Sequence, residues 1–201
     1  MLVWAIIIGV TAIVSVMAFS RAELIFRYDF NPYQIIHRGQ WYRIITHAFV
    51  HANWAHLIVN MLVLYSFGDA LVYYFSARMG GNPAWYVAGL YLGGIVASSI
   101  YTLYKERNNY NYSAVGASGA VSAVVFACIL FNPLSKIYFF AILPMPGIVF
   151  GIIYLAYEHY MSRRGMDNIG HDAHFYGALF GFVYPLLFRP DLLVYFFKQI
   201  F

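Results

Sequence analysis

Polar residues of three kinds that together can perform acyl transfer stand inside otherwise apolar segments of this 201-residue chain. Ser118 occurs in GASG, His56 and Asn60 are four residues apart in WAHLIVN, and His174 begins HFYGALFG. A hydroxyl, an imidazole and an amide can act as the nucleophile, the general base and a hydrogen-bond donor to an oxyanion. Because polar side chains in a membrane are costly unless they are paired or face water, their joint occurrence favours a reactive site.

Each of these residues also has a structural explanation. Ser118 and its small neighbours fit the small-residue pattern of close helix packing, and Ala120 stands where a G-x-S-x-G nucleophile elbow needs glycine. Asn60 could bridge two helices, and His56 could be a packing residue. The catalytic interpretation therefore depends on the residues occurring together.

A metal site is a further alternative, because imidazoles at the spacing of His47, His51 and His56 can bind zinc or iron. No cysteine stands near them and no H-E-x-x-H motif is present, so we expect no metal and no other cofactor. A carboxylate is not expected at the site either. Asp172 and His174, two residues apart on a helix, would point to different sides, and the other acidic residues lie in loops or near the ends of apolar segments. The prediction is a Ser–His dyad.

The composition indicates an integral membrane protein. With 62% hydrophobic and 10% charged residues, the chain is far more apolar than a soluble domain. Its net charge of +4 is spread over short loops, which fits contact with lipid headgroups and not a nucleic-acid surface. The single cysteine, Cys128, lies in an apolar run and is interpreted as a packing residue.

Six apolar segments approach the length that a helix needs to cross a bilayer. They predict one all-α domain over residues 1–201, with spans at about residues 2–19, 54–75, 83–104, 113–131, 146–160 and 174–188. The first lacks the basic region and cleavage site of a signal peptide, so we expect it to be retained. Residues 20–47 are expected to fold at the membrane interface. Pro144 and Pro146 predict that the fifth helix begins at Pro146, after an irregular or interfacial approach over KIYFFAIL.

Successive spans run in opposite directions, so the second, fourth and sixth begin on the same side of the membrane. The candidate residues all lie in the first turns of these three spans: His56 and Asn60, Ser118, and His171 and His174. We therefore expect them to share one face and one depth.

Several motifs resemble those of the rhomboid intramembrane serine proteases, over nearly the whole chain. HAFVHANWAHLIVN (47–60) is similar to the second-helix signature, GASG (116–119) to the nucleophile motif, and AHFYGALFG (173–181) to A-H-x-x-G-x-x-x-G. WYR (41–43) resembles the W-R element of the first loop, and LPMPG (143–147) resembles the start of the fifth helix. The resemblance implies a six-helix rhomboid-like bundle with a folded first loop.

The resemblance also implies roles for single residues. Ser118 would be the nucleophile and His174, not His171, the base; His56 and Asn60 would help to bind the oxyanion, with the Ser118 N–H at a helix start as a further donor. The glycines would thin the fourth and sixth helices so that the His174 imidazole reaches the Ser118 hydroxyl. Structural support is expected from Gly116, Gly119, Gly177, Gly181, Trp41, Arg43, His47 and His51.

Two positions depart from the family pattern. Ser122 stands where an aromatic residue often stacks on the base, and Val72 stands where a glutamate is common. The first concerns the orientation of His174, and the second concerns stability.

The function implied is hydrolysis of a peptide bond in or beside a transmembrane helix of another membrane protein, with a small residue before the cleaved bond. The alternatives are a non-catalytic rhomboid-like protein that binds or escorts client membrane proteins, and a transporter, which would need internal symmetry that the sequence does not display. The resemblance places the N-terminus in the cytoplasm, with the active site opening to the other side of the cell membrane. Eight Lys and Arg residues on that outer side, against four on the inner, oppose the positive-inside rule.

Overall fold

The computed structural model describes residues 2–139, 142–164 and 169–201, and within them the chain is mostly helical. In sequence order the main helices are α1 (Leu2–Phe19), α5 (Trp54–Arg78), α6 (Pro83–Lys105), α7 (Ser118–Phe131), α8 (Gly147–Arg164) and α9 (His171–Val183). Shorter helices form the first loop and the C-terminus: α2 (Ala22–Tyr28), α3 (Pro32–Arg38), α4 (Arg43–Thr46), η1 (His47–Phe49), η2 (Tyr184–Leu187) and α10 (Asp191–Ile200). A helix thus forms at each of the six apolar segments.

Three of these helices, α1, α5 and α6, are long and apolar enough to cross a membrane. A fourth span results if the segment His171–Leu187 is counted together with α10, from which it is bent by 115°. The described chain therefore has the character of a multi-pass membrane protein with three to four candidate spans. A helix of about 20 residues is needed to cross the bilayer core, and this requirement excludes α7 from the count.

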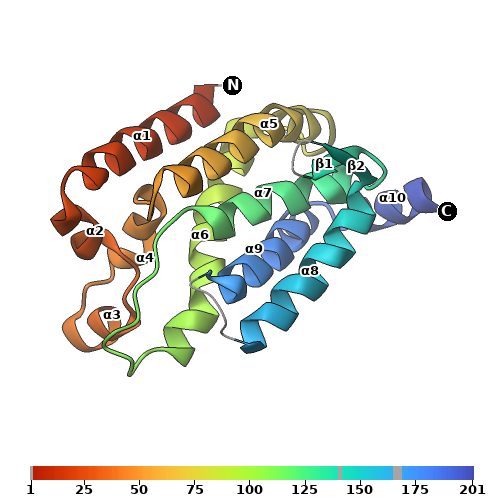
Figure 1. The fold of residues 1–201 in the computed structure, drawn as a ribbon. Coiled ribbons are helices and arrows are strands. Elements are labelled where there is room, and N and C mark those ends of the chain that lie inside the picture. Colours follow the sequence, from red (N-terminus) through yellow and green to blue (C-terminus); the bar gives the residue numbers. More distant parts are fainter. Residues whose placement is uncertain (1, 140–141, 165–168) are drawn as a thin grey trace.

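Helix α7 lies at the centre of the molecule. Its 14 residues extend about 21 Å at 1.5 Å per residue. Every residue after Ser118 is buried, and the helix packs against α9, α6 and α5. Figure 1 shows α7 between α5 and α9. It is a core helix, which brings its N-terminal residue into the interior of the bundle.

The start of α7 differs from the predicted residue 113. Ala114 is not helical, because it pairs through both backbone groups with Phe30 of the first loop in an antiparallel bridge. Gly116 then has φ +113°, which a helix does not accept, and its N–H donates to the His47 carbonyl at 2.9 Å. The helix can begin only after this glycine.

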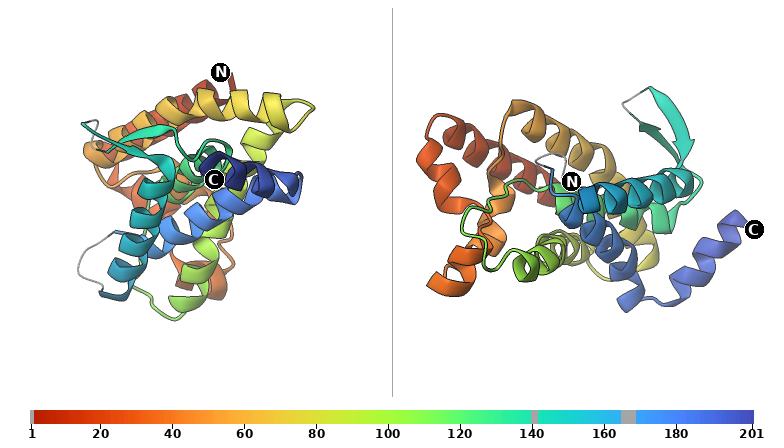
Figure 2. Two further views of the ribbon diagram at one scale, coloured as in Figure 1. Left: turned by 90° about the vertical axis from the view of Figure 1, so that its right-hand side faces the viewer. Right: turned by 60° about the horizontal axis from the view of Figure 1, so that its bottom comes forward.

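The approach to the fifth helix is also different from the prediction. Strands β1 (Lys136–Phe139) and β2 (Leu143–Pro146) form an antiparallel hairpin, so the chain is not purely α-helical. Pro144 and Pro146 lack a donor but are tolerated in a two-stranded hairpin, whose strands both have free edges. The hairpin and α10 protrude from the bundle in Figure 2. Phe140 and Ala141, within the predicted irregular approach, lie outside the described residues.

Other boundaries shift by a few residues. Helix α8 starts at Gly147 and continues to Arg164, four residues beyond the predicted end, and α9 starts at His171, three residues before the predicted start. The predicted folding of the first loop is observed, since α2, α3, α4 and η1 occupy most of residues 22–49.

Candidate active site

Ser118 and His174 meet at the point where α7 and α9 both begin. Ser118 Oγ lies 2.7 Å from His174 Nε2, a distance typical of a hydrogen bond from a hydroxyl to a neutral imidazole. Both residues are partly exposed, with 16% of the His174 side chain accessible. His171, the alternative base, is buried and turns its Nδ1 atom toward a different group. The structure therefore pairs Ser118 with His174.

The glycines of the two helices permit this contact. A Cβ atom on Gly177 would lie 2.1 Å from the Gly119 carbonyl oxygen, and one on Gly181 would lie 2.0 Å from the Ala123 carbonyl oxygen. A Cβ on Gly119 would in turn lie 2.4 Å from Ser98 Oγ of α6. Since no side chain fits at these positions, the backbones of α7 and α9 approach more closely than ordinary helices do.

His56 and Asn60 project from the first turns of α5. Asn53 caps this helix, with its side-chain oxygen accepting a hydrogen bond from the His56 N–H at 2.8 Å. The His56 ring lies against Gly116, where a Cβ would come within 2.4 Å of the imidazole. Asn60 is 4% exposed, and its side-chain nitrogen has no hydrogen-bond partner in the described part of the chain. The Asn60 amide nitrogen is thus a buried donor available for a ligand, one helical turn after His56 on α5.

His51 connects three elements beside the nucleophile. Its Nδ1 lies 2.9 Å from Ser15 Oγ of α1, and the Ala117 N–H points to its Nε2 at 3.5 Å. The Ser15 hydroxyl donates to the Phe49 carbonyl at 2.9 Å, so Nδ1 of His51 carries the proton and Nε2 accepts. Burial, followed by the neighbouring His56 and His47, lowers the pKa of His51 to about 3. Its neutral ring therefore holds the residue preceding Ser118.

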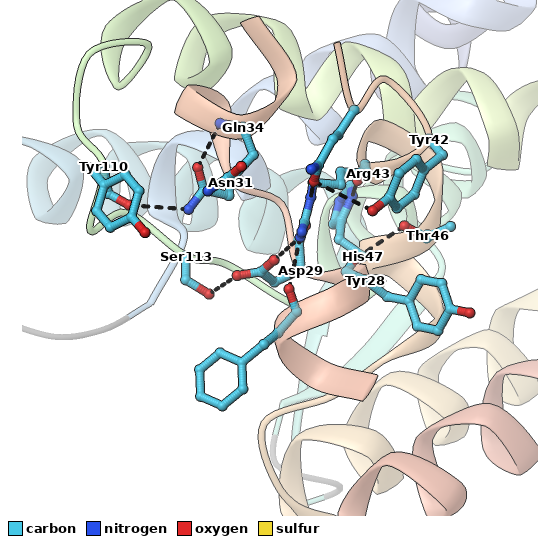
Figure 3. Close-up of polar contacts among 12 residues, drawn as sticks. Tyr28, Asp29, Asn31, Gln34, Tyr42, Arg43, Thr46, His47, Tyr110 and Ser113 are labelled. Carbon is cyan, nitrogen blue, oxygen red and sulfur yellow. Dashed lines mark hydrogen bonds and ion pairs between the residues drawn. The ribbon is translucent and has the colours of Figure 1, made fainter. Parts of the chain in front are cut away.

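An ion pair within the first loop includes a carboxylate that also bonds to the segment preceding α7. Buried Arg43 bonds to the carboxylate of buried Asp29, and the Ser113 hydroxyl donates to the other carboxylate oxygen at 2.6 Å (Figure 3). His47 Nδ1 lies 3.0 Å from the Arg43 carbonyl, and burial lowers the pKa of His47 to about 4. Trp41, by contrast, is 56% exposed. Arg43, His47 and His51 thus have structural contacts, whereas Trp41 has little burial.

The structure adds a carboxylate that sequence reasoning missed. Glu158 of α8 is 4% exposed, and its Oε1 lies 3.2 Å from Nδ1 of His174. Its Oε2 lies 2.5 Å from Nδ1 of His171. The expectation of a site without a carboxylate is wrong, because α8 extends to Arg164 and Glu158 is therefore within the helix and not near its end. A lone acidic residue in an apolar segment was the signal that could have found it.

Asp172 follows the expectation and points away from His174. It accepts from Lys105 Nζ at 2.8 Å and from the Ser162 hydroxyl. Ser122, at the first departure from the family pattern, forms a hydrogen bond with the Tyr154 hydroxyl of α8 at 2.7 Å. Val72, at the second, is partly buried and packs against the apolar core.

Residues that could hold a metal also lie here. Glu158, His171 and His174 offer ligand atoms within 4.8 Å of one another, although the hydrogen bonds just described account for the same proximity. His47, His51 and His56, the alternative considered from sequence, do not form such a group within the described residues.

The chain is similar in sequence to proteins of one known family. The rhomboid domain family matches residues 38–191. The chain is 27% identical over 155 residues to RHOMBOID-like protein 12, mitochondrial, of Arabidopsis thaliana, a match covering 70% of this chain and 44% of the relative. It is 27% identical over 163 residues to rhomboid protease GluP of Bacillus subtilis, covering 80% and 29% of the two chains.

The putative rhomboid protease YdcA of Bacillus subtilis is 30% identical over 149 residues, which cover 74% of this chain and 68% of that protein. For the two other relatives, the chain spans less than half of their length. The match to the family domain itself covers most of the chain, from the first loop through α9. The chain therefore belongs to the rhomboid family.

Proposed function

We propose that this protein is an intramembrane serine endopeptidase that cleaves transmembrane protein substrates in or next to their membrane segments. The observation that carries the proposal is the 2.7 Å separation between Ser118 Oγ and His174 Nε2. A serine hydroxyl within hydrogen-bond reach of an imidazole is the arrangement that activates a nucleophile for acyl transfer. The relatives named as rhomboid proteases support the same reaction class.

The mechanism follows from these atoms. Ser118 Oγ attacks the peptide carbonyl while His174 Nε2 takes its proton, and the resulting imidazolium then protonates the leaving amine. Water then attacks the acyl-enzyme while His174 Nε2 takes a proton from the water. The imidazolium returns this proton to Ser118 Oγ as the acid product leaves. The oxyanion receives hydrogen bonds from the Asn60 side chain, from His56 and from the Ser118 N–H at the start of α7. The substrate is expected to be locally extended, with a small residue before the cleaved bond.

We propose the corresponding architecture of six spans, formed by α1, α5, α6, α7, α8 and α9. The short α7 is shielded by its neighbours and does not have to match the bilayer by itself. In this arrangement Ser118 lies below the membrane surface, and the partly exposed site opens to the side where α5, α7 and α9 begin. We assign that side to the exterior of the cytoplasmic membrane.

The test uses purified protein in detergent, a fluorophosphonate probe and a transmembrane substrate. Ser118→Ala and His174→Ala are expected to abolish both labelling and cleavage with little effect on folding, because each removes one half of the nucleophile–base pair. Ser66→Ala, an exposed serine of α5, and His159→Ala, an exposed histidine of α8, are the matched controls. If the parent protein neither reacts nor cleaves, the non-catalytic alternative replaces this proposal.

A further inference from the structure

A buried carboxylate stands directly behind the proposed base. Glu158 lies between two histidines that are three residues apart on α9, and one carboxylate oxygen faces each ring. We propose that Glu158 is a positioning residue for His174, so that the site operates as a Glu–His–Ser series and not as a dyad; this inference rests on the proposed function.

The hydrogen-bond inventory determines the tautomer. An ionised carboxylate only accepts hydrogen bonds, so the Nδ1 atom that faces it at 3.2 Å carries the proton. Nε2 of a neutral His174 is then left with its lone pair directed at Ser118 Oγ, 2.7 Å away. This is the tautomer that can take the serine proton. With the proton on Nε2 instead, the ring would present a donor to the nucleophile and could not act as its base.

His171 holds the carboxylate from its other side. Its Nδ1 lies 2.5 Å from Oε2, and both side chains are almost fully buried, at 4% and 5% exposed. Residues three apart lie on one face of a helix, so His171 and His174 both project toward α8. With each oxygen engaged by a different ring, the carboxylate cannot rotate without losing a hydrogen bond. A buried charge is tolerated only when it is hydrogen-bonded in this manner.

Among the charged and titratable groups around His174, Glu158 is the carboxylate that can orient its ring. His56 approaches from α5, Ser118 from α7, His171 from its own helix and Glu158 from α8. Asp172, a carboxylate close in sequence, is engaged by Lys105 and Ser162. When the serine proton reaches His174, Glu158 is therefore placed to stabilise the imidazolium.

Glu158→Gln tests the inference with little change of shape. A carboxamide has one acceptor oxygen and so cannot receive both histidine donors. We expect kcat to fall about 10- to 1000-fold while KM and the melting temperature stay close to the parent values, since partners that orient a catalytic histidine have effects of this order. Asp172→Asn, which neutralises a carboxylate near the start of α9 that bonds to Lys105 and Ser162, is the matched control and should retain the parent kcat.

Two further measurements distinguish orientation from simple support. Glu158→Asp keeps the charge and should recover part of the lost kcat. In 15N NMR of histidine-labelled protein, the His174 signal, identified by its loss in His174→Ala, should report a neutral ring protonated on Nδ1 in the parent and a mixture in Glu158→Gln. This spectrum requires no substrate, so it tests the placement of the proton even if proteolysis is not observed.

The outcomes separate the two proposals. A parent protein that cleaves, with a Glu158→Gln variant of equal kcat or with only a lower melting temperature, overturns the positioning role and leaves the protease intact. A parent His174 protonated on Nε2 also overturns it. A parent protein without fluorophosphonate reactivity overturns the proposed function instead. If Glu158→Gln does not fold, the kcat of Glu158→Asp and the parent spectrum decide the question.

Discussion

At the scale of single residues, the side-chain nitrogen of Asn60 most needs an explanation, because it is buried without a hydrogen-bond partner in the described part of the structure. A buried donor without a partner costs about 1–3 kcal/mol, and folded proteins contain few of them. That cost is offset if the donor bonds to negative charge that develops only during the reaction. Asn60, one turn after His56 on α5, is placed for such a role.

We therefore expect Asn60→Ala to lower kcat about 10- to 1000-fold, as the removal of one oxyanion donor does in other acyl-transfer enzymes. Loss should be incomplete, because His56 and the Ser118 N–H remain. The melting temperature should change little, since the Asn60 side-chain nitrogen has no hydrogen-bond partner among the described residues. Steady-state kinetics and thermal melting check both points, with Ser66→Ala as a polar-to-alanine control on the same helix. A parent-like kcat would show that Asn60 only packs.

The sequence was sufficient to identify residue types that carry chemistry, but not all of their partners. Ser118 and His174 were predicted to meet because both lie near the start of helices that run in the same direction. Glu158 was not predicted, since its distance from the helix end depends on where α8 stops, and composition does not determine that residue. Partners contributed by a third element require the packing of helices to be known.

At the scale of elements, the contact between α7 and α9 determines the distance between nucleophile and base. Gly177 is three residues after His174 on α9, and its missing side chain leaves room for the Gly119 carbonyl. A glycine within a helix ordinarily costs about 0.5–1 kcal/mol relative to alanine. Replacing it would stabilise an isolated helix, so the sign of the effect in the protein reports on packing.

Gly177→Ala is expected to destabilise the protein and to lower its activity. The new methyl group would lie 2.1 Å from a backbone oxygen, which must move, and a displacement of about 1 Å at the reacting atoms can cost on the order of 100-fold in rate. Thermal melting and kcat of the purified variant measure the two effects.

The control for Gly177→Ala must lie on the outer face of α9. Helical spacing alone suggests Ala178, one position further on, but Ala178 is fully buried. Leu179 is 39% exposed, so Leu179→Ala should be milder in both assays. If Gly177→Ala melted at a higher temperature than the parent protein and cleaved normally, the contact between Gly177 and Gly119 would not determine how closely α7 and α9 approach.

The neutral histidines of the first loop predict how stability depends on pH. The pKa values of His51 and His47 are lowered by burial from about 6.5 to about 3 and about 4. At pH values between the ordinary pKa of 6.5 and the lowered pKa of each histidine, the unfolded chain binds protons that the folded chain does not. Stability therefore falls as the pH is lowered through this range. From pH 7 to pH 5 each histidine should remove about 2 kcal/mol of unfolding free energy.

Denaturant titration in detergent at the two pH values tests this expectation. His51→Gln should be less stable than the parent at pH 7, because the ring that connects Ser15 and Ala117 is lost, but its loss of stability on acidification should be about half as large. His37→Gln, which replaces an exposed histidine, should leave the pH dependence unchanged. A parent protein that is equally stable at both pH values would contradict the prediction.

The elements themselves were largely predictable, and their ends were not. Apolar length located a helix in all six segments. The predicted start of α7 was five residues too early. A long-range pairing between Phe30 and Ala114 prevents helix at that point of the chain. The β1–β2 hairpin was missed because two prolines in four residues indicate where a helix cannot be and do not indicate a strand.

At the scale of the whole molecule, the distribution of basic residues conflicts with the proposed orientation. The side where α5, α7 and α9 begin carries Arg21, Arg27, Arg38, Arg43, Lys105, Arg107, Arg163 and Arg164, and the opposite side carries Arg78, Lys136, Arg189 and Lys198. Cytoplasmic loops usually contain more Lys and Arg residues than the loops on the other side of the membrane. However, Arg43 is buried against Asp29, and Lys105 is paired with Asp172. The rule applies best to short loops with free charges, whereas much of this excess belongs to a folded segment.

Orientation can be measured with single cysteines on the two sides. The native Cys128 is buried in α7, so it should react poorly with a membrane-impermeant maleimide. Asn111→Cys places an exposed thiol on the side of the active site, and Ser135→Cys places one on the opposite side. We expect labelling of Asn111→Cys in intact cells, and of Ser135→Cys only after the membrane is permeabilised. The reverse pattern would mean that the positive-inside rule holds here and that Ser118 faces the cytoplasm.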